Sequence, residues 1–151
     1  MDGADRSQFE FGNDGPSVVV AGIDGSETSL RAGAFAAGLA RRERSRLVCV
    51  FVETFPGYVA VAAGGLTPVP VGDQLSTELQ KLVSEGAAYH GVPAELILRR
   101  GDPFTELTRV AGDLRADMVV VGASTHAGHR LIGSLAVRLV RAGRWPVTVV
   151  P

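Results

Sequence analysis

Short apolar runs alternate with longer segments of helical periodicity along most of this 151-residue chain. Four of the runs are rich in β-branched residues, as is typical of strands that are covered on both faces. They are residues 17–23 (SVVVAGI), 46–52 (RLVCVFV), 118–122 (MVVVG) and 146–150 (PVTVV). A fifth segment, residues 94–99 (AELILR), alternates with a period of two, which indicates a half-exposed or edge strand. The pattern therefore predicts five strands.

The first two helices are predicted between these strands. Ser26 suits the N-cap of the first helix, which is expected to end near Arg44, and Asp73 suits the N-cap of the second. The residues at helical spacing are Leu30, Ala34, Ala37 and Arg41 in the first helix and Leu75, Leu79, Leu82 and Val83 in the second. We expect these residues to mark the faces that cover the sheet.

A third helix is predicted to begin at Asp102 and Pro103. The aspartate can accept hydrogen bonds from the free amides of the first turn, and a proline at the first helical position lacks only an N–H that would be unpaired anyway. The side chains expected to share one face of it are Phe104, Leu107, Ala111 and Leu114. The last helix is predicted over residues 135–142, before the final strand.

The segment 53–72 is rich in glycine and proline and carries no clear period. This composition predicts a long irregular loop without helix or strand. Loops of this length are often lids, binding loops or contact surfaces, and an insertion without function is an equally open interpretation.

Taken together, strands and helices alternate in a way that predicts the α/β class. A single open parallel sheet with right-handed crossovers and helices on both faces follows from this order of elements. The sequence alone does not give the order of the strands within that sheet.

Composition narrows the possible functions. The net charge of −1 does not favour nucleic acid or an anionic membrane as a partner, and no run approaches the roughly 18 apolar residues of a membrane helix. The single cysteine, Cys49, lies in an apolar run and suits a reducing compartment. Residues 1–16 are polar, lack a hydrophobic signal core and are expected to form a disordered tail ahead of a domain over residues 17–151. A soluble cytoplasmic protein is expected.

A possible anion site lies in residues 118–134, where a strand, a glycine-bearing loop and a helix start follow one another. Free amides and the positive end of the helix dipole would both face the loop at Gly133 and Ser134. Asp24 follows the first strand, and it meets this loop in a crevice if the first and fourth strands are neighbours. Asp24 can then bind an adenine or ribose donor, or it can simply cap its own turn beside Gly25.

Three separated segments make the chain similar to a known family. VVVAGIDGSETS, RGDPFTELTRVAGDLRADMVVVGAS and GSLAVRLVRAGRWPVTVVP resemble, in this order, the universal stress protein family, and the resemblance covers about residues 17–151. It implies an adenine-nucleotide-alpha-hydrolase-like fold with strand order 3-2-1-4-5. It also implies a homodimer formed through the last strand, Val147–Val150. The family has members that bind ATP and members that do not.

The phosphate loop of the ATP-binding members reads Gly, two residues, Gly, nine residues, Gly, then Ser or Thr. Gly122 matches the first glycine, and Gly133 with Ser134 matches the final pair. Thr125 replaces the second glycine, and only seven residues separate it from Gly133. A threonine adds a Cβ where backbone must approach a phosphate, and it does not readily adopt a positive φ.

Two hypotheses follow from this altered loop. The first is a dimeric stress-response protein that binds ATP or another adenine nucleotide weakly, and the second is a dimeric interaction or regulatory module of the same fold, with an unidentified protein partner, that binds none. The residues that the resemblance assigns to nucleotide binding are Gly22, Ile23, Asp24, Val52, Val121, Gly122, Thr125, Gly133, Ser134 and Leu135.

Other candidate chemistry favours simpler interpretations. His126 and His129 have no acidic or cysteine neighbour and are expected to be solvated loop residues and not metal ligands. The arginines that recur every three residues, Arg138, Arg141 and Arg144, suit a solvated face, with a phosphate or partner contact as the alternative. No nucleophile–base pair, paired acids or Walker-type loop is recognisable, so no enzyme activity is expected.

Overall fold

The computed structural model describes residues 17–54, 57–60, 66–69, 71–124 and 133–151. Its elements in chain order are β1 (Val18–Gly22), α1 (Glu27–Glu43), β2 (Arg46–Glu53), β3 (Gly57–Ala60), β4 (Leu66–Val69), α2 (Val71–His90), β5 (Ala94–Arg100), α3 (Pro103–Asp113), β6 (Met118–Gly122), α4 (Ser134–Ala142) and β7 (Val147–Val150). The predicted disordered tail, residues 1–16, lies outside the described residues, as do Thr125, His126 and His129.

Five strands form one parallel sheet in the order β5-β2-β1-β6-β7. Numbered among themselves along the chain, these strands have the order 3-2-1-4-5, so the predicted topology is confirmed. The prediction that residues 94–99 form an edge strand is also confirmed, because β5 ends the sheet on one side. The direction of the crossovers changes between β1 and β6, and open parallel sheets form a crevice at such a point.

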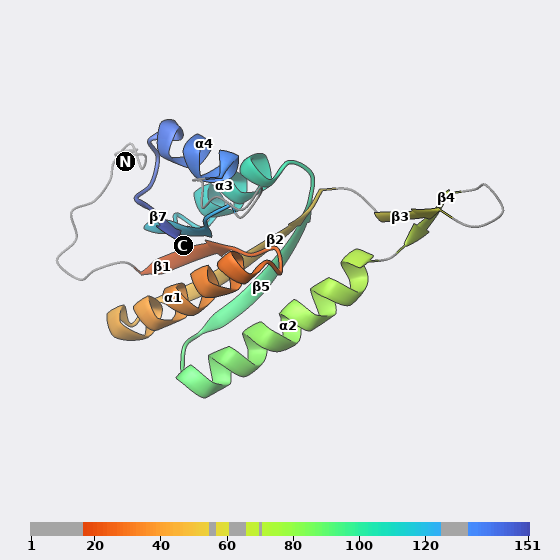
Figure 1. The fold of residues 1–151 in the computed structure, drawn as a ribbon. Coiled ribbons are helices and arrows are strands. Elements are labelled where there is room, and N and C mark those ends of the chain that lie inside the picture. Colours follow the sequence, from red (N-terminus) through yellow and green to blue (C-terminus); the bar gives the residue numbers. More distant parts are fainter. Residues whose placement is uncertain (1–16, 55–56, 61–65, 70, 125–132) are drawn as a thin grey trace, which may run out of the picture.

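Helices cover both faces of the sheet (Figure 1). Helices α1 and α2 pack on one face over a cluster that includes Val19, Cys49 and Val120, and α3 and α4 pack on the other over Val20, Val48 and Val119. Neighbouring residues of each strand point to opposite faces, which is why a continuous run of β-branched residues is needed to fill both. The predicted α/β class with helices on both faces is confirmed.

The predicted helix starts are confirmed for α1 and α3. The Ser26 side chain accepts a hydrogen bond from the Ser29 N–H at 3.3 Å, and Asp102 accepts one from the Thr105 N–H at 2.9 Å, with Pro103 next in the chain. Helix α1 ends at Glu43, and the following residue, Arg44, forms a left-handed C-cap with a φ of 55°. The predicted stripe of α3 is confirmed as well, because its residues pack in the cluster under that helix.

The predicted buried face of α1 is wrong by part of a turn. Leu30 is 37% exposed, and the residues against the sheet are Ala32, Ala36 and Ala40, which are almost fully buried. Alanines let the helix axis approach the sheet closely, and a face made of such small residues has little hydrophobic contrast for a pattern to reveal. Of the predicted stripe, Ala37 packs partly against the core.

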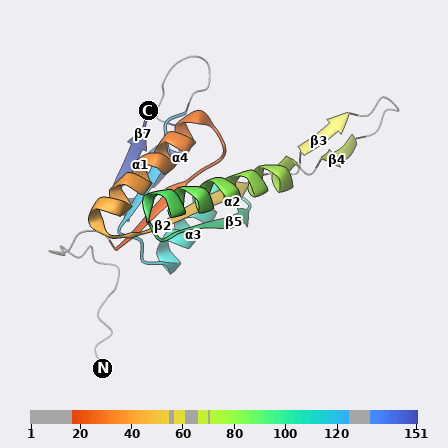
Figure 2. The same cartoon turned by 90° about the horizontal axis from the view of Figure 1, so that it is seen from below.

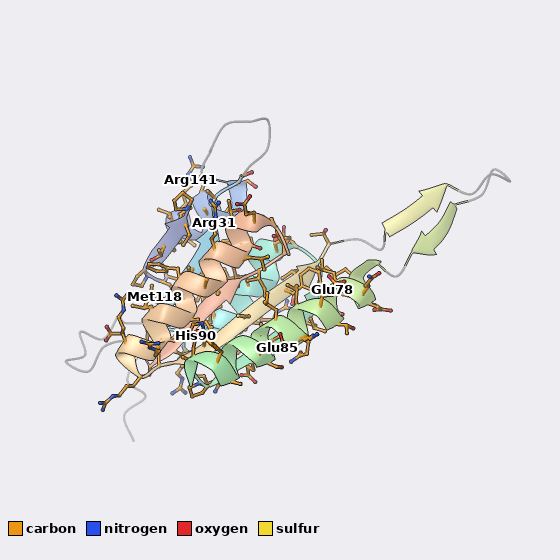
Figure 3. All side chains as sticks on the ribbon, turned by 60° about the horizontal axis from the view of Figure 1, so that its bottom comes forward. Arg31, Glu78, Glu85, His90, Met118 and Arg141 are labelled. Atoms are coloured by element: carbon orange, nitrogen blue, oxygen red, sulfur yellow. The ribbon has the colours of Figure 1, made fainter. Side chains whose placement is uncertain are left out.

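Helix α2 begins earlier than predicted, at Val71, so that Asp73 lies in its first turn and is not the N-cap. Leu79 and Val83 are buried, as expected, but Leu82 is 49% exposed and points away from the sheet. Glu78 and Glu85 are exposed on the outer side of the same helix (Figure 3). The predicted apolar stripe contained both Leu82 and Val83. Consecutive residues of a helix point 100° apart, so Val83 faces the core while Leu82 is exposed.

The prediction of an irregular loop over residues 53–72 is wrong. Strands β3 and β4 form an antiparallel hairpin in which Tyr58 pairs with Pro68, and the hairpin extends away from the main sheet (Figures 1 and 2). Proline is compatible with a two-stranded ladder because each strand has one edge that needs no N–H donor. The glycines and prolines thus interrupt the segment without preventing strand pairing.

Among the described residues, no helix combines the length and the apolar character that a membrane span requires.

Candidate functional site

A cavity of about 650 Å³ opens at the carboxyl ends of β1, β2 and β6. It lies at the point of the sheet where the crossovers change direction, between the loops that follow β1 and β6. The residues predicted to bind a nucleotide that line it are Gly22, Ile23, Asp24, Val52, Val121, Gly122, Gly133, Ser134 and Leu135. The structure therefore brings these predicted residues together, whereas Thr125 lies outside the described residues.

Asp24 is held in a turn at the end of β1. Its Oδ1 accepts a hydrogen bond from the Ser26 N–H at 2.8 Å, and its own N–H donates to Ser29 Oγ at 3.1 Å. Burial acts to raise the pKa of this carboxyl, but hydrogen bonds from Ser26 and Ser29 outweigh it, so the pKa lies below its usual value. The carboxylate is thus ionised at neutral pH. The alternative that Asp24 stabilises its own turn is confirmed, and the same carboxylate also lines the cavity.

Gly122 is required by packing between β6 and α1. A Cβ at this position would lie 2.5 Å from the carbonyl carbon of Thr28 and 2.7 Å from the Ser29 nitrogen, which are backbone atoms. The Thr28 hydroxyl also donates a hydrogen bond of 2.7 Å to the Ala123 carbonyl. The end of β6 and the first turn of α1 are therefore in direct contact.

The first turn of α4 faces the same cavity. Gly133 is the N-cap with φ −63° and ψ 157°, and among the described residues this cap makes no side-chain capping hydrogen bond. Ser134, Leu135 and Ala136 line the cavity. Free N–H groups together with the positive end of a helix dipole favour an anion at this place.

The cavity is also lined by charged and polar residues outside the predicted nucleotide-binding set. The first turn of α1 contributes Ser26, Thr28 and Ser29, and the end of β2 contributes Glu53 and Thr54. Among the described residues that line it, the acids are Asp24 and Glu53, and there is no Lys, Arg or His. The predicted N-cap at Ser26 identified this turn, but nothing in the neighbouring sequence indicated that Glu53 lines the cavity.

The remaining candidates are the arginines of α4 and its C-terminal turn and the possible metal ligands. Arg138, Arg141 and Arg144 are all exposed, so the predicted solvated face is confirmed. Two of these arginines also contact the protein surface: Arg138 pairs with Asp102 at 3.1 Å and lies over the Phe104 ring, and Arg144 lies over the Trp145 ring. In the part of the chain that the structure describes, no group of three His, Cys, Asp or Glu residues could hold a metal ion.

The fold and the cavity define a class of protein: an open parallel α/β domain with a cavity of ligand size at the switch point of its sheet. A family model described as "Universal stress protein family" matches residues 17–151. The chain belongs to the universal stress protein family, and its sheet has the adenine-nucleotide-alpha-hydrolase-like topology of that family.

Individual relatives agree with this assignment. Universal stress protein MJ0531 of Methanocaldococcus jannaschii is 28% identical over 87% of this chain and 80% of its own length. A universal stress family protein from Burkholderia pseudomallei has a solved structure that is 26% identical, with a TM-score of 0.67 over 89% of this chain and 96% of that chain. A universal stress protein solved in complex with cAMP is 27% identical and has the same TM-score and coverage.

Proposed function

We propose that this protein is a stress-response protein that binds an adenine nucleotide, such as ATP or a nucleotide with fewer phosphates, in the cavity between β1 and β6. The observation that carries the proposal is the position of the α4 amino terminus, whose amides have no described side-chain cap and face a cavity of about 650 Å³. Such a volume lies within the usual range for small-molecule sites. A relative of similar fold that binds cAMP supports an adenine nucleotide as the ligand class.

The lining suits such a ligand. The α4 end offers N–H donors for a phosphate, apolar residues such as Ile23 and Val52 suit the faces of a base or sugar, and Asp24 offers an acceptor. Because the described lining contains no basic side chain, a bound phosphate would depend on amides and the helix dipole there. Together with the shortened loop around Thr125, this predicts weak binding.

The test is a pair of variants at one position. Ser134→Pro removes the N–H of the first helical residue, and the ψ of 157° at Gly133 is compatible with a following proline. Ser134→Ala, the matched control, retains this N–H. In isothermal titrations with AMP, cAMP and ATP with Mg²⁺, we expect at least one dissociation constant below ~1 mM in the wild type and in Ser134→Ala, and clearly weaker binding in Ser134→Pro. Equal affinity in both variants would contradict the proposed phosphate position.

A homodimer through β7 is the second part of the proposal. β7 ends the sheet, and apolar side chains flank it on both faces: Phe35 on α1 is 43% exposed and Val140 on α4 is 58% exposed. Phe35 lies one turn after Arg31, which donates a hydrogen bond to the Pro151 carbonyl next to β7. An exposed strand edge with apolar flanks is a favourable surface for a second copy.

The dimer is tested by Phe35→Glu, with Leu82→Glu on α2 as a control of similar exposure. Sedimentation velocity should show a dimer for the wild type and the control, and a monomer for Phe35→Glu. A monomeric wild type, or a Phe35→Glu variant that remains dimeric with unchanged affinity, would rule out this interface.

A module that binds no nucleotide is the alternative, and two observations favour it. Gly122 is explained by its contact with Thr28, and Asp24 by its turn, so neither residue requires a ligand. Absence of heat and of thermal stabilisation with every adenine nucleotide at millimolar concentration would establish this alternative. In either case the proposed role is binding and not catalysis.

A further inference from the structure

Glu53 stands at the end of the cavity opposite to α4. It is the last residue of β2, its side chain is 20% exposed, and it lines both the large cavity and a smaller adjoining one of about 320 Å³. Arg100, the residue paired with it on β5, donates from Nε to Glu53 Oε2 at 2.8 Å. Among the described residues, no hydrogen bond is made to the other oxygen, Oε1.

The position of Glu53 gives the cavity two chemically different ends. β2 and β6 flank β1, so their carboxyl ends are about 10 Å apart at the usual spacing of strands. The β6 side carries the N–H donors of α4, whereas the β2 side carries the Glu53 carboxylate, with the Asp24 carboxylate between them after β1. A ligand that fits both ends has an anionic group at one end and hydrogen-bond donors at the other.

We propose that Glu53 is a specificity-determining residue that accepts a hydrogen bond from the nucleoside part of the ligand. The donor is an N–H or O–H group, either the exocyclic amine of the base or a ribose hydroxyl. A phosphate is disfavoured at this end by the nearby carboxylates, which fixes the direction of the ligand in the cavity. This inference rests on the proposed nucleotide binding and goes beyond it by naming the group that is recognised.

Arg100 holds the end of β2 in place and does not itself recognise the ligand. Its side chain is 80% exposed, so the ion pair with Glu53 lies at the cavity mouth and adds little to stability. Its bond to Oε2, together with the backbone bond from the Gly101 N–H to the Glu53 carbonyl at 3.0 Å, holds the end of β2 beside β5. The carboxylate, and not the pair, is the element that would recognise the ligand.

The chain contains a matched control for this carboxylate. Glu95 on β5 accepts a hydrogen bond of 2.6 Å from Arg46 on β2, so a second ion pair joins the same two strands at their amino ends. Glu95→Gln therefore breaks a similar pair away from the cavity. Glu53→Gln removes the charge at the cavity, and Arg100→Met breaks the pair there while leaving the carboxylate.

The experiment measures the affinity of these proteins for AMP, 2′-deoxy-AMP, 3′-deoxy-AMP and inosine 5′-monophosphate by isothermal titration. We expect the wild type to prefer AMP over the analogue that lacks the recognised donor by about tenfold or more. That preference should shrink severalfold in Glu53→Gln and persist in Arg100→Met and Glu95→Gln. The analogue whose disadvantage shrinks identifies the donor as amine or hydroxyl.

Other outcomes separate the two proposals. If AMP binds the wild type but Glu53→Gln keeps the full preference for AMP, the role of Glu53 is refuted while nucleotide binding stands. If Arg100→Met loses the preference as fully as Glu53→Gln, the ion pair determines specificity and the carboxylate does not. If neither these nucleotides nor cAMP or ATP with Mg²⁺ bind the wild type, the proposed function itself fails.

Discussion

The contact between Gly122 and α1 predicts a large effect of adding a single methyl group. In Gly122→Ala the new Cβ would lie 2.5 Å from the Thr28 carbonyl carbon, whereas nonbonded carbons prefer a separation of about 3.5–4.0 Å. Either β6 or the first turn of α1 must move by about 1 Å. Gly122 has no positive φ, so the whole effect comes from this overlap and not from backbone strain.

The surrounding structure resists such a movement. The first turn of α1 is held by the Ser26 cap and by the bond from Thr28 to the Ala123 carbonyl, and Val121 before Gly122 is buried. Overpacking of a well-packed interior costs about 1–3 kcal/mol of unfolding free energy. For a domain of this size, that corresponds to a Tm lower by about 2–12 °C.

Urea denaturation followed by circular dichroism measures this cost, with Gly38→Ala and Gly86→Ala as controls. No atom lies within 4 Å of a Cβ at either control position, and both are inside helices, so alanine should stabilise them by about 0.5–1 kcal/mol. If Gly122→Ala is as stable as the wild type while both controls behave as expected, the close contact with Thr28 is not present.

Three further predictions concern two core side chains and one surface ion pair. Cys49 is 3% exposed and burial raises its pKa to about 12, so it should not react with a thiol reagent at pH 8 until the protein is unfolded. Thr28→Val loses the hydrogen bond to Ala123 and should lower the unfolding free energy by about 1 kcal/mol in urea titrations; no change would contradict the role of this bond. Hydrogen bonds from Arg138 and Thr105 lower the pKa of Asp102 from 3.8 to about 2, so its stabilising effect should be present above pH 4 and be lost as the pH falls toward 2. Asp102→Asn should therefore lose less stability than the wild type over this range, and equal losses would argue against the pairing.

Much of the fold could be predicted because its signals are local. Buried parallel strands require continuous apolar runs, and the chemistry of Asp102 and Pro103 marks a helix start within two residues. The face of α1 could not be predicted because Ala32 and its neighbours in contact with the sheet are as small as the exposed alanines. The strand order came from the family resemblance, since the pattern of elements does not contain it.

The candidate site could be predicted only in part, because some of its contacts join residues that are far apart in the sequence. Carboxyl ends of parallel strands meet at one edge, so Asp24 and Gly122 could be placed together once the order was known. The contact of Thr28 with Ala123 joins residues 95 positions apart, and nothing in either neighbourhood indicates it. Glu53 was assigned to the start of an irregular segment, whereas it ends β2 and lines the cavity.

Direct titration of the wild-type protein with AMP, with GMP as the comparison, tests the central claim. The N–H donors at α4 and the carboxylates at β1 and β2 predict saturable heat for AMP with a dissociation constant below ~1 mM. The adenine preference proposed from the cAMP-bound relative predicts weaker binding of GMP. Absence of saturable heat with AMP would contradict the nucleotide site in this cavity, and equal affinity for GMP would contradict its preference for adenine.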